Sequence, residues 1–245
     1  MNTVLHEEAQ GNLDALAKNP YPGRGLVLGL TADVSKLVLI YWIMGRSENS
    51  RNRVFSSDGG RLFTEAADPS KVKDPSLIIY DAMLEADGVY AVSNGHQTEA
   101  ALAACLHSGS LERGLSIFQY EPDAPNFTPR ITGVLSVRDD RPLAEIAILR
   151  KAHGSPECER EFFRYEKIPA GYGYCVTTYA GDGEPLPPFV GEPLLVPLPG
   201  VDGDSLVETY WQALDEKNRV SLAVKLVSLD SPERAVKIAN KYRKV

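Results

Sequence analysis

The order of the predicted elements indicates an α+β fold built on antiparallel sheets. Roughly ten segments have the apolar or alternating character of strands, and they follow one another in neighbouring pairs joined by short turns. The four or five predicted helices lie between groups of strands and do not follow every strand. A doubly wound parallel sheet would need a crossover helix for each strand. We therefore expect two stacked antiparallel sheets with helices packed outside them.

The N-terminal part begins with a helix and continues with two strands. The helix is expected over residues 4–18, where leucines form a partial apolar stripe. Pro20 and Pro22 cannot continue a helix, so the helix ends before them. Strands are expected at residues 25–29 and 35–44, and their short connection predicts a hairpin.

The middle of the chain is expected to alternate between strand pairs and short helices. The predicted strands are residues 54–57, 61–65, 77–84, 89–93, 131–137, 143–150 and 172–179. The predicted helices are residues 99–107, with Thr98 as N-cap, and residues 111–118. Residues 157–165 fit a helix and a strand equally well.

The C-terminal part is expected to contain a long loop and then more regular structure. Residues 181–203 contain six prolines and five glycines, which predicts a loop docked by its apolar side chains. A helix is expected over residues 205–214, with Asp204 or Ser205 as its cap, followed by a strand at 220–228.

The last residues also carry a helix-start signal. Serine before proline, at Ser231-Pro232, is typical of an N-cap followed by the first helical position. We therefore expect a final helix that ends in the basic residues 241–244.

The composition is that of an acidic globular protein. The 245 residues carry a net charge of −7, and no basic stripe follows any predicted element. Nucleic-acid binding needs concentrated positive charge, so we expect no nucleic-acid partner. No apolar run approaches the length of a membrane span, and the first residues lack a signal pattern. We therefore expect no membrane partner and a cytoplasmic location.

Several chemistries have no signal in the sequence. The three cysteines are widely spaced, and the four histidines show no HxxxH spacing, so neither a disulfide framework nor a metal centre is expected. The sequence contains no phosphate-binding P-loop motif, no strand-linked GxGxxG and no GxSxG elbow. Neither ATP or NAD binding nor a serine hydrolase is therefore indicated.

One segment, residues 45–53, is the strongest candidate for a binding site. It reads Gly-Arg-Ser-Glu-Asn-Ser-Arg-Asn-Arg and directly follows an apolar strand. Guanidinium groups pair bidentately with phosphate or carboxylate, and the small residues allow backbone N–H groups to turn toward the same anion. Arg51 and Arg53 would share one face of an extended segment, with Arg46 nearby. A solvated hairpin tip is the alternative interpretation.

Other polar residues lie at predicted strand ends, where loops can build a site. They are Arg24 between two glycines, Tyr80 beside a strand, Asn94 before a helix, and Glu121, Asn126 and Thr128 in a proline-rich loop. Each also has a purely structural interpretation. A turn would explain Arg24, and a core or rim position would explain Tyr80. Helix capping would explain Asn94, and a stiff surface loop would explain the other three.

Five short motifs occur in one order along the chain. They read Tyr-Pro-Gly-Arg-Gly, Gly-Arg-Ser-Glu-Asn-Ser-Arg-Asn-Arg, Asp-Pro-Ser-Leu-Ile-Ile-Tyr, Ser-Asn-Gly-His-Gln-Thr and Asn-Phe-Thr-Pro-Arg-Ile. Together they resemble the archaeal-type IMP cyclohydrolase family and its bacterial relatives. The resemblance extends over residues 21–179. The N-terminal helix and the last sixty or so residues lie outside it.

The resemblance implies a fold and a domain organisation. The fold is an Ntn-hydrolase-like, four-layer αββα sandwich that lacks an N-terminal nucleophile. On this basis we expect one domain over residues 1–245, with a helical extension at 1–20 and a C-terminal extension at 181–245. The oligomeric state is left open, and a homo-oligomer is one of the options.

The resemblance also implies a reaction, the last step of purine synthesis. In that step 5-formamidoimidazole-4-carboxamide ribonucleotide (FAICAR) closes to IMP and loses water. The partner is thus a small purine nucleotide, whose phosphate suits arginine forks. Ring closure needs orientation, proton transfer and stabilisation of an oxyanion, and it requires no metal or other cofactor.

Roles for the candidate residues follow from this implied reaction. Arg24, Arg51 and Arg53 are expected to hold the phosphate or the developing oxyanion, and Arg46 to support the segment around them. Asn94, Asn126 and Thr128 are expected to contact the carboxamide and imidazole edges. Tyr80 and Glu121 are the candidates for proton transfer.

Two other functions are compatible with the same residues. A non-catalytic purine-nucleotide binder or sensor would keep the arginines but not the proton-transfer groups. An amidohydrolase of the related fold would need processing that exposes Thr3 as the N-terminal nucleophile. The presence of both Tyr80 and Glu121 favours the cyclohydrolase.

Overall fold

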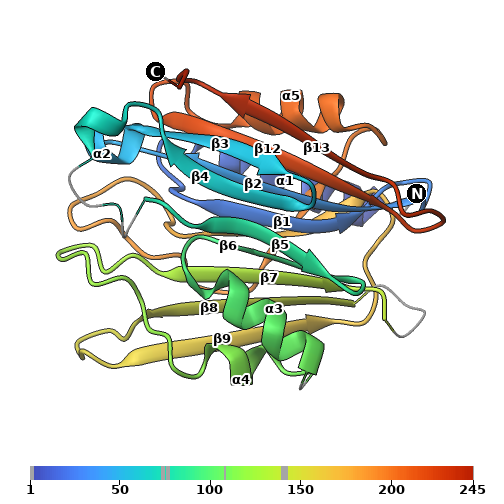
Figure 1. Ribbon diagram of the computed structural model, residues 1–245, viewed down its shortest axis with the longest axis horizontal. Helices are drawn as coiled ribbons and strands as arrows, with labels where there is room; N and C mark the ends of the chain where they lie inside the picture. The colour runs from blue at the N-terminus through green and yellow to red at the C-terminus, as the bar shows by residue number, and fades with distance from the viewer. Residues whose placement is uncertain (1–2, 73–74, 76–77, 108, 139–142, 245) are drawn as a thin grey trace.

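The computed structural model describes residues 3–72, 75, 78–107, 109–138 and 143–244, which form two stacked sheets (Figure 1). The six-stranded sheet has the spatial order β11 (Leu194–Pro197), β10 (Tyr172–Thr177), β1 (Gly25–Leu30), β2 (Lys36–Met44), β12 (Arg219–Ser228) and β13 (Arg234–Asn240). The seven-stranded sheet runs β3 (Arg53–Asp58), β4 (Arg61–Ala66), β5 (Asp81–Ala86), β6 (Val89–Ser93), β7 (Arg130–Ser136), β8 (Leu143–Lys151) and β9 (Cys158–Tyr165). Neighbouring strands in both sheets are antiparallel, as predicted.

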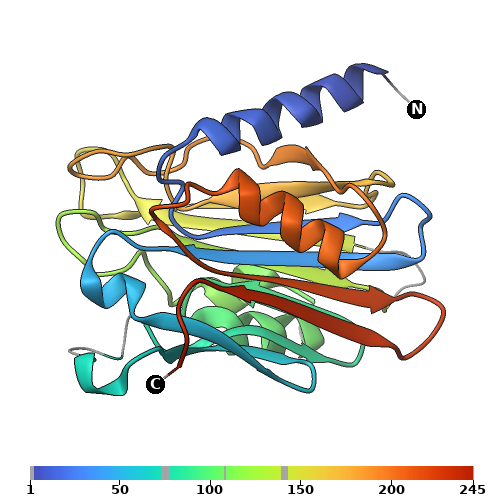
Figure 2. The same cartoon turned by 90° about the horizontal axis from the view of Figure 1, so that it is seen from above.

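Helices cover the outer face of each sheet, so the layers follow the predicted αββα order. Helices α1 (Thr3–Lys18) and α5 (Gly203–Ala213) pack on the six-stranded sheet (Figure 2). Helices α3 (Gln97–His107) and α4 (Leu111–Leu115) pack on the seven-stranded sheet. Two short elements, α2 (Glu48–Arg51) and a 3-10 turn (Pro69–Lys71), connect strands. No helix in the described part of the chain is long and apolar enough to cross a membrane.

Strand β2 shows why its sequence is continuously apolar. Successive side chains of a strand point to opposite faces, and both faces of β2 are covered. Tyr41 and Ile43 point into the core between the sheets, whereas Ile40 and Trp42 pack under the outer helices. A run without polar residues is therefore required at this position.

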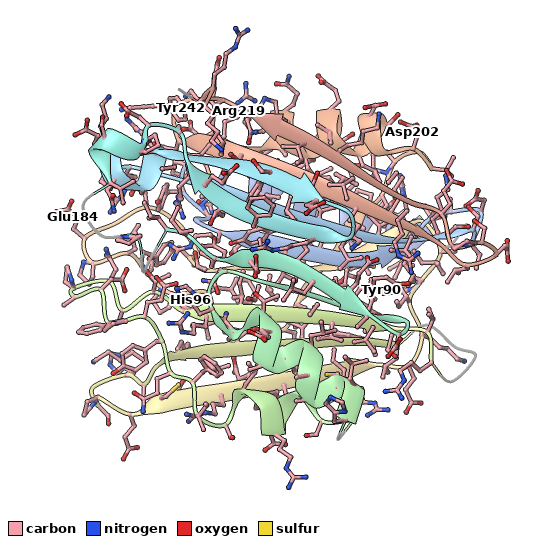
Figure 3. All side chains as sticks on the ribbon, viewed as in Figure 1. Tyr90, His96, Glu184, Asp202, Arg219 and Tyr242 are labelled. Carbon is pink, nitrogen blue, oxygen red and sulfur yellow. The ribbon has the colours of Figure 1, made fainter. Side chains whose placement is uncertain are left out.

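One end of the sandwich collects the loops that carry the candidate residues. The first residue of β1, Gly25, pairs with Trp42 near the end of β2 and with Thr177 at the end of β10. Strands β3, β5 and β7 of the other sheet begin at this same end. Figure 3 labels His96 and Glu184 there, and Tyr90 at the opposite end. Antiparallel pairing thus places residues distant in sequence at one edge.

The predicted final helix is wrong, because residues Arg234–Asn240 form strand β13. The strand pairs with β12, and Val236 and Ile238 pack against the core between the sheets. Backbone pairing and this apolar contact outweigh the local signal at Ser231-Pro232. In addition, the Asn240 side chain bonds to both backbone groups of Phe55, which ties β13 to the other sheet.

Smaller differences concern element boundaries. The segment 157–165 is a strand, β9, with Phe163 and Tyr165 packed against the core. The predicted loop 181–203 contains strand β11, which pairs with β10. Helix α5 begins two residues earlier than predicted, at Gly203, and its cap is Asp202, whose carboxylate accepts from the Ser205 N–H at 2.8 Å.

Helix α3 also begins before its predicted start. Gln97 is its first residue, so Thr98 lies inside the helix and is not its cap. The Thr98 hydroxyl donates instead to backbone carbonyls, including that of Asp81. The predicted strand start at residue 77 lies outside the described residues, as do residues 139–142 between the two strands predicted at 131–137 and 143–150.

Candidate active site

The centre of the candidate site is a buried ion pair between Arg24 and Glu121. Arg24 precedes β1 and is 9% exposed, whereas Glu121 lies in the loop before β7 and is 3% exposed. The Arg24 Nη2 donates to Glu121 Oε2 at 2.8 Å. The Glu121 backbone is fixed by its N–H, which donates to the carbonyl of Thr128 at 2.8 Å. Two residues predicted for the site are therefore in direct contact.

A second arginine, Arg130, approaches the same carboxylate. Its Nη1 lies 3.9 Å from Glu121 Oε1 and donates to Gln97 Oε1 at 2.9 Å. Its Nε donates to the carbonyl of Gln119 at 2.8 Å, so the guanidinium is held from three sides. Burial lowers the pKa of Arg130, and the charge of Arg24 lowers it further, while Glu121 opposes both effects. The sequence-based site did not include Arg130, although it stands two residues after Thr128.

A third guanidinium, that of Arg53 at the start of β3, is buried. This side chain is 2% exposed, and it donates from Nε to the carbonyl of Ser50 at 2.8 Å and from Nη2 to that of Met44 at 3.3 Å. Burial lowers the pKa of Arg53; the Tyr80 phenol opposes this, and the charge of Arg24 adds to the lowering. The charges of Arg24, just before β1 of the six-stranded sheet, and Arg53, in β3 of the seven-stranded sheet, therefore repel each other.

Tyrosine hydroxyls complete this centre. The hydroxyl of Tyr80, just before β5, is 2.7 Å from that of Tyr41 on β2. The hydroxyl of Tyr179 is 2.5 Å from that of Thr128, and its ring stacks on Tyr21 with the centroids 5.9 Å apart. Burial raises the pKa of Tyr179 to about 12, despite the opposing charge of Arg24. This phenol therefore stays protonated at neutral pH.

The centre has an excess of positive charge and an unused donor. The guanidiniums of Arg24 and Arg130 lie beside the carboxylate of Glu121, and the buried Arg53 is close enough to Arg24 for their charges to interact. The carboxylate of Asp123 acts on Arg130. Within the described ranges, the buried Nε of Arg24 has no hydrogen-bond partner. A buried donor without an acceptor is costly, so a ligand that supplies an oxygen acceptor or a negative charge would be stabilised here.

The segment 45–53 does not form the extended face that its sequence predicted. Residues Glu48–Arg51 form the helical turn α2, and the hydroxyls of Ser47 and Ser50 cap it reciprocally. Arg51 and Arg53 therefore do not share one face, and their guanidinium groups have different partners. It donates from Nε to the carbonyl of Gly45 at 2.9 Å and from Nη2 to Asn218 at 3.3 Å.

Comparison with known protein families now identifies the chain at the family level. The model of a family described as IMP cyclohydrolase-like protein matches residues 21–231. The chain belongs to the IMP cyclohydrolase-like family. The match begins at Tyr21, as the motifs indicated, but it continues beyond residue 179 and includes β11, α5 and β12. A search of curated proteins finds no match.

Arg46 lies at the rim of the site in this member of the IMP cyclohydrolase-like family. It donates from Nη1 to Asp182 Oδ1 at 2.5 Å, and its guanidinium stands 5.1 Å from the ring centroid of Tyr21. About a third of its side chain is exposed. Arg46 therefore connects the site loops to the segment after β10, and its supporting role in binding stays a prediction.

The remaining predicted residues all contact backbone or side-chain groups of the site loops. Asn94 is fully buried and bonds to the carbonyl of Pro129, the N–H of Ile131 and the amide of Gln97. Asn126 accepts from the N–H of Leu186 at 3.0 Å. The Asn94 amide and the Asn126 amide oxygen are thus occupied by the fold, and substrate contact by either residue stays a prediction.

Thr128 contacts the backbone of Glu121 directly. Its hydroxyl is shared between Tyr179 and Asp123 Oδ2, and its N–H donates to Asp123 Oδ1 at 2.6 Å. Its carbonyl accepts from Glu121. Thr128 therefore connects the tyrosine to the loop that positions the Glu121 carboxylate.

Proposed function

We propose that this protein is an IMP cyclohydrolase that closes FAICAR to IMP in purine biosynthesis. The observation that carries the proposal is the Arg24–Glu121 pair, which lies near the guanidiniums of Arg53 and Arg130. Among the described residues, the buried Nε of Arg24 has no hydrogen-bond partner. The membership of the IMP cyclohydrolase-like family supports a nucleotide substrate of this class. An anionic substrate would balance the excess positive charge.

The reaction requires few functional groups. The carboxamide nitrogen forms a bond to the formyl carbon, and the bond from that carbon to its oxygen breaks. The oxygen leaves as water with one proton from the carboxamide nitrogen and one from the formamido nitrogen. Orientation of the two arms supplies much of the rate, since well-oriented intramolecular reactions gain about 7–11 kcal/mol.

The buried arginines supply electrostatic stabilisation in this proposal. Arg24 donates to the oxyanion that develops on the formyl carbon, because its unpaired Nε and its burial make such a bond strong. Arg51 and Arg53 hold the phosphate, or Arg53 joins Arg24 at the oxyanion. Asn94, Asn126 and Thr128 are kept as candidates for contact with the base.

Glu121 and Tyr80 carry the protons. Glu121 removes a proton from the carboxamide nitrogen and returns it to the oxyanion, for which its place beside Arg24 is suitable. Tyr80 gives its proton to the leaving hydroxyl and regains one from the formamido nitrogen. Every proton that leaves the substrate thus ends on the departing water, and both side chains return to their initial states.

The direct test is spectroscopic conversion of FAICAR to IMP by the purified protein with no added cofactor. We expect turnover by the wild-type protein and loss of at least about a hundredfold in kcat for Glu121→Gln or Tyr80→Phe. Tight IMP binding without turnover would contradict the proposal and favour the nucleotide sensor. Absence of both binding and turnover would contradict both functions.

A further inference from the structure

The hydroxyl pair of Tyr41 and Tyr80 joins the two sheets at the candidate site. Tyr41 comes from β2 of the six-stranded sheet, and Tyr80 precedes β5 of the seven-stranded sheet. Their hydroxyl oxygens are 2.7 Å apart. Tyr41 is fully buried in the core, where its ring lies 5.6 Å from that of Phe55. The charges of Arg24 and Arg53 act on the Tyr41 phenol.

The direction of this hydrogen bond follows from burial. Each hydroxyl has one proton, and the described residues offer the Tyr41 hydroxyl no partner besides Tyr80. If Tyr80 donated, the proton of Tyr41 would be left unpaired in a dry core, which is unfavourable. If Tyr41 donates, its proton is paired, and the proton left free to point elsewhere belongs to Tyr80, which is 5% exposed whereas Tyr41 is 0% exposed. Burial also raises the pKa of Tyr41 well above its usual value, so Tyr41 keeps its proton.

The backbone around Tyr80 allows little adjustment. Its N–H donates to the hydroxyl of Thr64 at 2.8 Å, and its carbonyl accepts from the N–H of Thr64 at 3.0 Å. The Tyr80 backbone is therefore held by β4, and its hydroxyl is paired with that of Tyr41.

We propose that Tyr41 is a positioning residue for catalysis, which donates to the oxygen of Tyr80 and directs the Tyr80 proton toward the substrate. The inference rests on the proposed function, because it needs Tyr80 to transfer a proton. When Tyr80 gives its proton to the leaving hydroxyl, the donor from Tyr41 is already in place to stabilise the phenolate. The phenolate then regains a proton from the formamido nitrogen, while Tyr41 remains protonated throughout.

The test compares Tyr41→Phe with Tyr80→Phe in the FAICAR assay. We expect Tyr41→Phe to lower kcat about tenfold or more and to leave KM within about twofold. In the Tyr41→Phe/Tyr80→Phe double variant, kcat should be no lower than in Tyr80→Phe alone, because Tyr41 acts only through Tyr80. Additive losses would overturn the inference, and so would a kcat of Tyr41→Phe equal to that of the wild type.

Tyr210→Phe is the matched control. Tyr210 is also fully buried, and its hydroxyl donates to the carbonyl of Pro197 at 2.8 Å under helix α5, away from the candidate site. We expect it to lower the midpoint of urea unfolding about as much as Tyr41→Phe but to keep the wild-type kcat. An equal loss of kcat in both variants would assign the Tyr41 effect to stability and overturn the inference.

The two proposals can fail separately. If the wild-type protein turns over FAICAR but Tyr41→Phe does too at the same rate, only the role of Tyr41 is overturned. If the wild-type protein neither binds IMP nor turns over FAICAR, the proposed function is overturned, and the role of Tyr41 with it.

Discussion

Arg24 and Glu121 are 97 residues apart in the sequence and form a 2.8 Å ion pair in the structure. The pair connects the start of β1 to the loop before β7, and hence the two sheets. Both side chains are nearly inaccessible to solvent. Removing one partner of such a pair destabilises the fold by more than the intact pair stabilises it, because a lone buried charge remains.

We expect Glu121→Gln to destabilise the fold as well as to remove activity. Loss of one partner of a buried pair costs about 3–5 kcal/mol, since Arg24 keeps its charge without compensation. Urea unfolding followed by circular dichroism measures this difference. Asp182→Asn is the control, because it removes the partly exposed pair with Arg46, for which about 1 kcal/mol or less is expected. Equal destabilisation by both substitutions would contradict the special position of Glu121.

Arg51→Ala and Arg53→Ala should separate binding from catalysis. Arg53 is buried beside Tyr80 and Arg24, so its loss is expected to lower kcat by about tenfold or more. Arg51 is half-buried at the end of α2, so its loss is expected to raise KM with little change in kcat. Steady-state kinetics with FAICAR decides this. A higher KM for Arg53→Ala with a lower kcat for Arg51→Ala would exchange the two roles. If neither substitution changes kcat or KM, neither residue belongs to the site.

Gly23→Ala should disturb the site through the backbone that positions Arg24. Gly23 has a φ of +75°, and an added Cβ would lie 2.2 Å from Thr178 Oγ1. Gly59→Ala is the matched control, because Gly59 has a φ of +57° but no atom within 4 Å of the added Cβ. The backbone conformation alone costs an alanine about 1–2 kcal/mol. We expect thermal unfolding to show a clearly larger loss for Gly23→Ala, with reduced turnover only in that variant.

Stability should fall at alkaline pH as buried phenols and thiols are forced to ionise. Burial raises the pKa of Tyr179 from 10.0 to about 12, and that of Cys175 from 9.0 to about 12. Above the ordinary pKa the unfolded chain releases these protons while the folded chain retains them, so stability is lost as pH rises from about 9 to about 12. Urea midpoints across this range measure the effect. Tyr179→Phe should reduce the slope above pH 10, and an unchanged slope would contradict the assignment.

Regular elements with a strong periodic pattern were predictable from the sequence. The continuously apolar run before Gly45 indicated a strand at residues 35–44, and β2 covers Lys36–Met44. The pattern did not indicate that Tyr41 would reach Tyr80, because the partner lies on the other sheet. A tyrosine inside an apolar run carries no local sign of function.

Where local signals conflicted with tertiary contacts, the contacts prevailed. Ser231-Pro232 is a good helix start in isolation, yet the following residues pair with β12, whose exposed edge needs a partner strand. Similarly, Arg51 and Arg53 share a face only in an extended chain, and the capping serines of α2 turn the segment between them.

The sequence by itself determined the fold class, most strands and the residue types needed for an anion site. The tertiary structure decided which of the candidate residues meet. Arg24, Arg53 and Arg130 each stand at or beside the start of a different strand, and only the stacking of the two sheets brings them to one buried centre with Glu121. The physical reason is that propensity and periodicity act over a few residues, whereas burial and charge pairing depend on neighbours from distant parts of the chain.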